Sequence, residues 1–352
     1  MLEDTGLVFR RAAGAALGPL ARWLTAGQPR ILFYHRFAPD GGRALAPEAF
    51  EYHLAYLTRH FVPMPLSRLI EARRGGAPLP RRAVVLTVDD GYRDFLDHAY
   101  PLLEKYAVPA TLYVVSEFAA GNLWLWFDRL RYVCEQAKVA RLAVPGEADA
   151  TAFPLGTRAE RERAWDVLSS RCLTLRTAER EDLIEDLAAV AEVSLPAKAP
   201  HAFAPAGIDA LRALDPALVD IGAHTRSHPI LSMCSDPEVE DEVIGSVRSL
   251  TAALGRPVTS FCYPNGRPVD FDRRAIDAAR AAGCTNATAS TGMLLPAVAN
   301  PFALPRFGAA HEASTFRHEM DGLTYLQSRL TGRHVDVPAG EMAGRAARPR
   351  PA

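Results

Sequence analysis

The stretch Ala83-Val84-Val85-Leu86-Thr87-Val88 is a mostly apolar run, and Asp89-Asp90-Gly91 follows it directly. A short apolar run without polar alternation is typical of a strand buried on both faces in a parallel sheet. The apolar positions from Phe95 to Tyr106 then have helical spacing, and Pro109 precedes a second β-type run over 111–115. Strand, helix and strand in this order predict a β-α-β unit.

The same alternation extends to both sides of this unit. Ile31-Leu32-Phe33-Tyr34 is an earlier buried strand, and further strands are predicted at 219–222, 258–263 and 286–289. Between them lie a helix that starts with Asp236 as N-cap and ends at Gly255, and a second helix over 273–282. Repeated strand-helix alternation of this kind favours a parallel (β/α) barrel.

The middle of the chain has a different pattern. A length of 352 residues allows two domains or one barrel with an insertion. Residues 121–206 are predicted to be a helical insertion, with a capping box at Thr157 and Glu160 and a later helix that turns Leu183, Leu187 and Val190 inward. The expected organisation is an N-terminal amphipathic segment (1–29), a discontinuous barrel (30–120 and 207–330), the insertion (121–206) and a disordered tail (331–352).

The composition excludes several classes of protein. The chain has 40 Lys and Arg against 41 Asp and Glu, a net charge of −1, so no basic excess favours a nucleic-acid partner. Hydrophobic residues at 49% and charged residues at 23% are ordinary for a folded domain. Five separated Cys without a Cys-x-x-Cys pair indicate neither a disulfide framework nor a zinc knuckle. This cysteine usage favours a reducing compartment, and we expect a cytoplasmic protein.

The N-terminus leaves two interpretations open. No stretch of the sequence predicts a transmembrane span, and the small-residue run after Arg10 and Arg11 is a weak imitation of a signal peptide. Residues 1–29 are expected instead to pack on the domain or to rest on a membrane surface as a peripheral contact.

Asp89 and Asp90 stand where a predicted strand ends, and Gly91 lets the chain turn sharply. Consecutive side chains diverge in an extended or turning backbone, so one carboxylate can bind a metal while its neighbour stays free as a base. Taken alone, however, Asp-Asp-Gly is more often a turn with two solvated carboxylates.

A second motif changes that balance. His224-Thr225-Arg226-Ser227-His228 follows another predicted strand and places two imidazoles four residues apart, which on a helical turn would face the same side. Neutral imidazole is a favoured ligand for zinc and other late divalent ions, and two His with one carboxylate leave positions open for water and substrate.

Both motifs resemble those of the polysaccharide deacetylases, carbohydrate esterase family four. Thr87-Val88-Asp89-Asp90-Gly91 is similar to the Thr-Phe-Asp-Asp-Gly motif, and His224 to His228 match His-Ser/Thr-x-x-His. The resemblance covers about residues 30–120 and 207–330. It extends to Phe33-Tyr34-His35-Arg36-Phe37, Phe261-Cys262-Tyr263-Pro264-Asn265-Gly266 and Leu304-Pro305-Arg306-Phe307.

The resemblance implies a deformed (β/α) barrel that holds a divalent metal ion, most simply Zn²⁺, with Co²⁺ or Ni²⁺ as alternatives. It implies Asp90, His224 and His228 as the metal ligands and Asp89 as the general base. It also implies a substrate-binding loop of Tyr263, Pro264 and Asn265, in which the backbone N–H of Asn265 stabilises the oxyanion.

The chain departs from the family pattern at two places. Cys262 and Asn265 stand where better-known members carry an Arg that tethers the base and an aromatic residue, and Arg306 is a candidate replacement for the tether on position alone. Near the end of the chain, no clear Leu-x-x-His motif supplies the family's general-acid His. His35 and His311 are substitutes, although a structural role is the more common use of such a histidine.

The expected activity is removal of acetyl groups from the N-acetylated amino sugars of a saccharide, in cell-surface or exopolysaccharide biosynthesis. Two alternatives stay open: a metal hydrolase of another non-peptide C–N or ester bond, and a barrel that binds saccharide without turnover. Trp124, Trp126, Phe127 and Asp128 open the insertion near the expected catalytic face. An aromatic platform for a sugar is one interpretation of these residues, and core packing of the insertion is the more common one.

Overall fold

A computed structural model describes residues 17–39, 43–146, 152–292 and 294–331. The first part of the expected N-terminal segment and nearly all of the expected tail, 332–352, lie outside the described residues. All structural statements below concern the described part of the chain.

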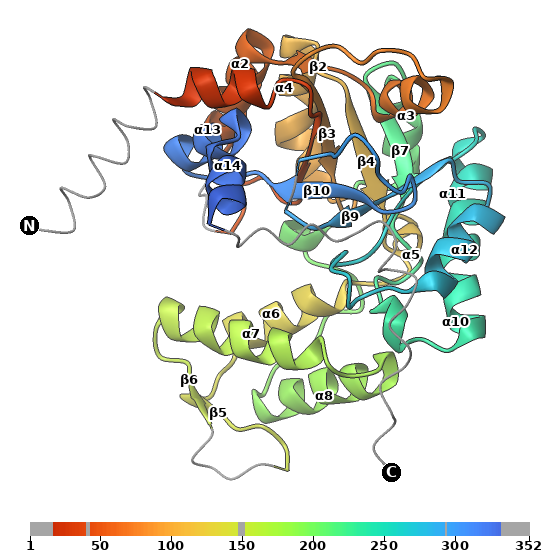
Figure 1. The fold of residues 1–352 in the computed structure, drawn as a ribbon. Coiled ribbons are helices and arrows are strands. Elements are labelled where there is room, and N and C mark those ends of the chain that lie inside the picture. Colours follow the sequence, from red (N-terminus) through yellow and green to blue (C-terminus); the bar gives the residue numbers. More distant parts are fainter. Residues whose placement is uncertain (1–16, 40–42, 147–151, 293, 332–352) are drawn as a thin grey trace, which may run out of the picture.

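A closed barrel of parallel strands forms the body of the molecule (Figure 1). Its order is β1-β10-β9-β8-β7-β4-β3, and β3 pairs back onto β1 to close the ring. The closure is uneven, because β1 and β3 share five residue pairs whereas β7 and β8 share only Ala223 with Phe261. The expected deformed barrel is confirmed. Its strands are β1 (Arg30–Tyr34), β3 (Ala83–Val88), β4 (Ala110–Val114), β7 (Val219–Ala223), β8 (Ser260–Cys262), β9 (Asn286–Ser290) and β10 (Leu304–Gly308), and β2 (Val62–Pro63) extends the sheet beside β3.

Helices surround the barrel and bury its outer face, as expected for strands that are apolar on both sides. They are α2 (Pro47–His60), α3 (Leu66–Gly75), α4 (Tyr100–Tyr106), α5 (Ser116–Ala119), α9 (Ile208–Ala213), α10 (Asp236–Glu240), α11 (Ser246–Leu254), α12 (Arg273–Ala281), α13 (Ala313–Asp321) and α14 (Leu323–Leu330). The predicted helix after Asp90 consists of a π-helical turn, Phe95–Ala99, that continues into α4. The helix predicted to start with Asp236 as N-cap begins one residue earlier, with Ser235 and Glu238 forming a capping box.

The inserted helices α6 (Trp126–Gln136), α7 (Arg158–Cys172) and α8 (Thr177–Val190) form a separate group beside the barrel, with the short strands β5 (Arg141–Leu142) and β6 (Phe153–Pro154) (Figure 1). This group has its own apolar cluster, in which α6 contributes Leu130, α7 contributes Leu168 and α8 contributes Leu187. The capping box of Thr157 with Glu160 is confirmed. The inward orientation of Val190 was wrong, because the helical phase buries Ile184 and leaves Val190 exposed.

Residues 17–24 are helical and lie beside α2 and α13, where Arg22 pairs with Asp321. The side chains of Leu17, Leu20, Trp23 and Leu24 are all more than half exposed. The expected peripheral membrane contact stays a prediction. No helix in the described part of the chain is long and apolar enough to cross a bilayer.

Candidate active site

The Asp-Asp-Gly motif forms a sharp turn at the end of β3. Asp90 and Gly91 both have left-handed backbones, with φ of 73° and 85°. A side chain at Gly91 would bring its Cβ within 3.2 Å of Val114 Cγ1, so glycine is required there both for its φ and for space. Asp89 and Asp90 are 3% and 2% exposed, so the alternative of two solvated carboxylates is wrong. The turn points two buried acids in different directions.

The His-x-x-x-His motif is a loop after β7, and the predicted helical turn is wrong. Thr225 and His228 have φ of 66° and 62°, which bends the chain back on itself. His228 N donates to Thr225 Oγ1 at 3.0 Å, and Glu242 accepts from the backbone N–H groups of Arg226 and Ser227 at 2.8 and 2.9 Å. These hydrogen bonds hold the loop so that both imidazoles face the same side. The loop thus brings the two rings together without a helical turn.

Asp90, His224 and His228 lie together as a candidate metal centre. Asp90 Oδ1 lies 3.6 Å from His224 Nε2 and 3.5 Å from His228 Nε2. His224 Nδ1 donates to the Cys262 carbonyl at 2.7 Å, and because a carbonyl only accepts, Nε2 keeps its lone pair. Asp90 Oδ1 is buried and has no hydrogen-bond partner among the described residues. The lone pair on His224 Nε2, the nearby His228 Nε2 and an orphaned carboxylate oxygen fit a divalent cation.

The electrostatics of the three groups agree with this assignment. Burial lowers the pKa of His224 to about 4 and holds the pKa of His228 well below its ordinary value. Burial, followed by the charge of Asp89, raises the pKa of Asp90 well above its usual range. The imidazoles are therefore neutral at pH 7, which is the form that binds a metal, and the buried carboxylate lacks a compensating positive charge.

Asp89, His224 and Cys262 form a second cluster that could hold a metal ion. Both oxygens of Asp89 already accept hydrogen bonds from Arg306. Burial raises the pKa of the Cys262 thiol, which disfavours the thiolate that a metal requires. The set of Asp90, His224 and His228 is therefore the better candidate.

Arg306, on β10, contacts Asp89 directly. Arg306 Nη1 and Nη2 donate to Asp89 Oδ1 and Oδ2, each at 2.8 Å, and Nη1 also donates to Thr87 Oγ1 at 2.8 Å. Arg306 is only 1% exposed. Burial raises the pKa of Asp89, but the nearby Arg306 guanidinium lowers it by more. The pKa of Asp89 is therefore held below its usual range. Arg306 thus lies in contact with Asp89, as a replacement for the arginine that tethers the base would. Because its pKa is lowered, Asp89 is ionised at neutral pH.

We predict that Arg306→Lys moves the acid limb of the pH–rate profile to higher pH. An ammonium keeps the charge but not the two-pronged contact, so the Asp89 pKa should rise towards its ordinary value and fewer molecules carry the ionised carboxylate at low pH. Loss of the two-pronged contact should also destabilise the fold, by less than the about 3–5 kcal/mol that removal of one charged partner of a buried pair costs. Measurements of kcat/KM against pH and of urea unfolding check both effects.

Arg30→Lys provides the matched control. Arg30 is a fully buried arginine on β1 whose guanidinium donates to the carbonyl of Met320 and to Thr25, away from Asp89. It should lower stability without moving the pH profile. An Arg306→Lys enzyme with an unshifted acid limb would contradict the tether.

His35 lies at the edge of this site. Its Nε2 is 3.8 Å from Asp89 Oδ2, and its side chain is 47% exposed. A group at this position can reach both solvent and a substrate bound near Asp89. His311 is exposed and lies near His53, which stacks on Phe316, so the structure does not bring His311 to the candidate metal centre.

The three residues of the predicted substrate-binding loop have different surroundings. Tyr263 is fully buried, stacks on Phe271 with ring centroids 3.9 Å apart, and donates its hydroxyl to Phe302 O. Its side chain is thus packed in the main apolar core and is not available to a substrate. Pro264 is also buried. Asn265 is partly exposed with φ of 55°, so of the three it alone can present its backbone at the surface.

A polar network that the sequence did not predict joins the barrel to the insertion. The Arg36 guanidinium donates to Asp94 at 2.5 Å and lies 3.9 Å over the Tyr92 ring, and Tyr92 donates to Asp128 of α6 at 2.5 Å. The only sequence signal was the position of Arg36 directly after His35. Phe127 meets the His228 ring with centroids 5.2 Å apart, so the insertion reaches the candidate metal centre. Trp124 and Trp126 are both buried, so neither forms an open platform, and Trp126 belongs to the apolar cluster of the insertion.

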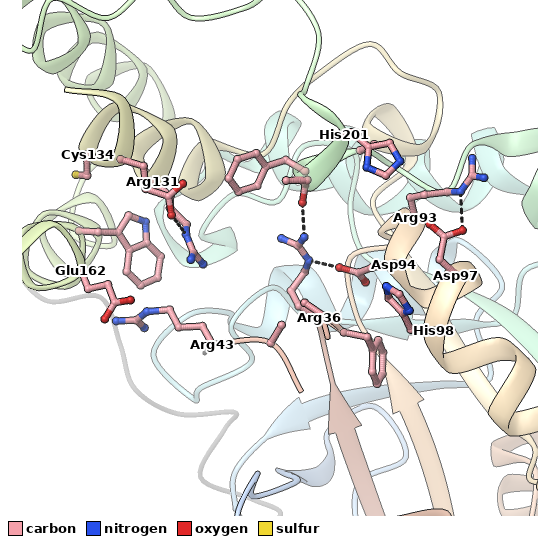
Figure 2. A pocket seen from close by; sticks show the side chains of 18 of the residues that line it. Arg36, Arg43, Arg93, Asp94, Asp97, His98, Arg131, Cys134, Glu162 and His201 are labelled. Carbon is pink, nitrogen blue, oxygen red and sulfur yellow. Dashed lines mark hydrogen bonds and ion pairs between the residues drawn. The ribbon is translucent and has the colours of Figure 1, made fainter. Parts of the chain in front are cut away.

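This network borders a cavity of about 660 Å³ between the barrel and the insertion (Figure 2). Arg36, with Asp94 beside it, lines the barrel side. Trp165 of α7 lines the opposite side, with the Arg43 guanidinium 4.3 Å over its ring. Planar polar groups beside aromatic rings provide both hydrogen bonds and apolar surface for a ligand.

We predict that Asp128→Asn removes a pH dependence from the stability of the fold. Burial raises the pKa of Asp128 to about 6. A raised folded pKa gives stabilisation that is present at low pH and lost as the pH rises through that value. Between pH 5 and pH 8 the wild type should therefore lose about 1.4 kcal/mol relative to the variant, one pKa unit's worth. Urea unfolding of both proteins at both pH values measures this effect. A difference in free energy of unfolding between wild type and variant that is the same at both pH values, or that favours the wild type more at pH 8, would contradict the prediction.

Comparison with known proteins gives a family match for more than half of the chain. Residues 76–287 match the polysaccharide deacetylase family. Over 50 residues, 14% of this chain, the sequence is 46% identical to the poly-β-1,6-N-acetyl-D-glucosamine N-deacetylase of Escherichia coli (strain K12). That stretch is only 7% of the relative's own length.

Solved structures share the fold. The Streptococcus pyogenes deacetylase PplD, in complex with acetate, superposes with a TM-score of 0.54 at 15% identity, over 82% of this chain and 96% of that one. IcaB from Ammonifex degensii gives a TM-score of 0.53 at 14% identity, over 84% and 97%. At these identities the likeness establishes a common fold.

Proposed function

Because this chain belongs to the polysaccharide deacetylase family, we propose that it is a metal-dependent hydrolase that removes acetyl groups from N-acetylated amino sugars of a poly- or oligosaccharide. The observation that carries the proposal is that two groups of side chains lie next to each other. One is the buried set of Asp90, His224 and His228, and the other is Asp89 hydrogen-bonded to Arg306.

Asp90, His224 and His228 would hold a divalent metal ion, which when bound acidifies a water molecule and polarises the acetyl carbonyl. The chain's own contribution is the base. Asp89 is ionised at neutral pH and its orientation is fixed by Arg306, so it accepts the proton that the attacking water gives up. Zn²⁺ is the proposed ion, because two imidazoles and one carboxylate suit it and leave positions open.

Two further groups complete the proposed mechanism. The left-handed backbone at Asn265 turns the chain at the end of β8, and we propose its N–H as a donor to the oxyanion that develops on the acetyl carbonyl. We propose His35 as the group that protonates the departing amine, because its partly exposed ring lies 3.8 Å from Asp89.

For the substrate, we propose a chain of amino sugars and not a single sugar. The E. coli relative is named for poly-β-1,6-N-acetyl-D-glucosamine, which supports a role in cell-surface or exopolysaccharide biosynthesis. Arg36, which follows His35 in the sequence, lines the cavity between barrel and insertion, and we propose that Trp165 and the charged side chains of that cavity bind sugar units that flank the reacting one.

Acetate release from N-acetylglucosamine oligomers of increasing length tests the proposal, with zinc-loaded and chelated protein compared. Release that requires the metal and increases with oligomer length is expected. Metal-dependent hydrolysis of simple aryl acetates without release from oligomers would instead support the alternative of another ester or C–N substrate. A protein that binds oligomers but releases no acetate with metal bound would contradict the catalytic proposal.

A further inference from the structure

Arg180, near the start of α8, is a buried cation with no ion-pair or hydrogen-bond partner among the described residues. It is 1% exposed, and its guanidinium carbon lies 4.8 Å over the ring of Trp126. Its Nε and Nη1 are buried and have no hydrogen-bond partner among the described residues. A buried charge that is neither paired nor hydrogen-bonded is costly, so native proteins rarely keep one unless something else satisfies it.

The two acids whose charge acts on Arg180 already have other partners. Glu181 forms an ion pair with Arg129 of α6, and Glu242 accepts hydrogen bonds from the backbone of Arg226 and from Ser227. Burial lowers the pKa of Arg180, and the charge of Glu181 only partly offsets that effect. The surroundings therefore do not supply the counter-charge that Arg180 requires.

A cavity of about 680 Å³ adjoins Arg180. Trp124 and Trp126 also line it, and the buried indole Nε1 of each lacks an acceptor among the described residues. Arg180 and the two indoles together thus have four donor nitrogens without an acceptor, all on residues that line one cavity. The rest of the wall includes Leu123, Val193 and Leu195.

We infer that this cavity binds an oxyanion, a phosphate or carboxylate group, on Arg180 and the two indole N–H groups. Donors without acceptors favour a ligand rich in acceptor oxygens, and a guanidinium pairs with phosphate and carboxylate through two parallel hydrogen bonds. The cavity holds much more than a bare anion, and its wall has both apolar and polar side chains, which suits an anionic group carried on a sugar. Glu181 and Glu185 also line it, and Arg129 pairs with both. The site is distinct from the cavity at Arg36 and does not depend on the proposed hydrolysis.

Thermal unfolding of the chelated full-length protein against inorganic phosphate concentration tests the inference, because chelation prevents phosphate from binding a metal ion. A ligand that binds only the folded state raises Tm in a saturable way. We expect Arg180→Gln to weaken the apparent affinity at least tenfold, about 1.4 kcal/mol. Phosphate also stabilises proteins by exclusion from their surface, so the difference between variants is the quantity to compare.

Arg163→Gln is the matched control, since it removes the same charge from an exposed position on α7. It should respond to phosphate as the wild type does. Without phosphate, Arg180→Gln should be as stable as the wild type or more stable, because it removes an uncompensated buried charge.

Trp126→Phe is a second variant that keeps an aromatic ring over Arg180 and removes only one donor. It should weaken phosphate binding less than Arg180→Gln does, and it decides the matter if Arg180→Gln does not fold. Equal phosphate responses in the wild type and the folded variants would overturn the inference.

The same assay with sugars distinguishes the sources of the anion. Stronger binding of glucuronate or glucose 6-phosphate than of inorganic phosphate, with no binding of glucose, would place the anion on a saccharide. Binding of inorganic phosphate alone would assign the site to a free anion. A wild-type protein that none of the three anions stabilises beyond the Arg180→Gln variant would overturn the inference.

Discussion

Asp89→Asn is expected to lower kcat for acetate release by about 10²- to 10⁴-fold, the range for loss of a positioned general base. The amide fills the same space but cannot accept the proton of the attacking water. Arg306 would then face a neutral group in a buried site, so some stability should be lost as well. Initial rates at saturating oligomer, with zinc content measured on the same samples, check the prediction.

Zinc content separates the two candidate metal clusters. If Asp90, His224 and His228 are the ligands, Asp89→Asn keeps its zinc and loses its rate. If Asp89, His224 and Cys262 are the ligands, the same variant loses zinc. Asp220→Asn, at a strand carboxylate on β7 that does not belong to either cluster, is the control and should keep both zinc and rate. An Asp89→Asn protein with full zinc and an undiminished rate would contradict the assignment of the base.

His224→Ala is expected to abolish both metal binding and acetate release. The variant lacks one of the three proposed ligands. In the wild type, the hydrogen bond from His224 Nδ1 to Cys262 O fixes the orientation of that imidazole. Loss of a partner that only orients a ligand costs about 10- to 100-fold in metal affinity, so loss of the ligand itself should exceed that. Zinc titration by calorimetry, compared with the rate at each metal concentration, measures the effect.

His35→Gln is the comparison for this variant. His35 lies beside Asp89 at the edge of the site and is absent from the candidate metal clusters. It should bind zinc normally and lose only the contribution of leaving-group protonation. If His224→Ala bound zinc as tightly as His35→Gln does, the metal would not be at the proposed centre.

The sequence was sufficient for the barrel because its evidence is local and repeated. The apolar run at 83–88 is a strand because its pattern is typical of strands buried on both faces, and a residue pattern of helical spacing follows it. The capping box at Thr157 likewise follows from residues three apart in the chain. The exact N-cap at Ser235 and the phase of α8 at Ile184 were missed, because one-residue shifts depend on neighbouring elements.

The site was only partly accessible from the sequence. Two motifs located Asp89, Asp90, His224 and His228, and barrel logic placed them at strand ends. The sequence could not show that the His motif is a left-handed loop held by Glu242, or that Tyr263 faces the core, because both depend on contacts made by distant segments.

By itself, therefore, the sequence predicted the strand-helix alternation and the barrel from local periodicity, and the candidate ligands from the resemblance of two short motifs to those of a known family. Only the tertiary structure decided the contact of Arg306 with Asp89, 217 positions away, and the unpaired state of Arg180 beside Trp126. Both depend on which side chains burial brings together and which partners it leaves available. Burial is a property of the packed whole, and a linear pattern does not encode the distance between two buried charges.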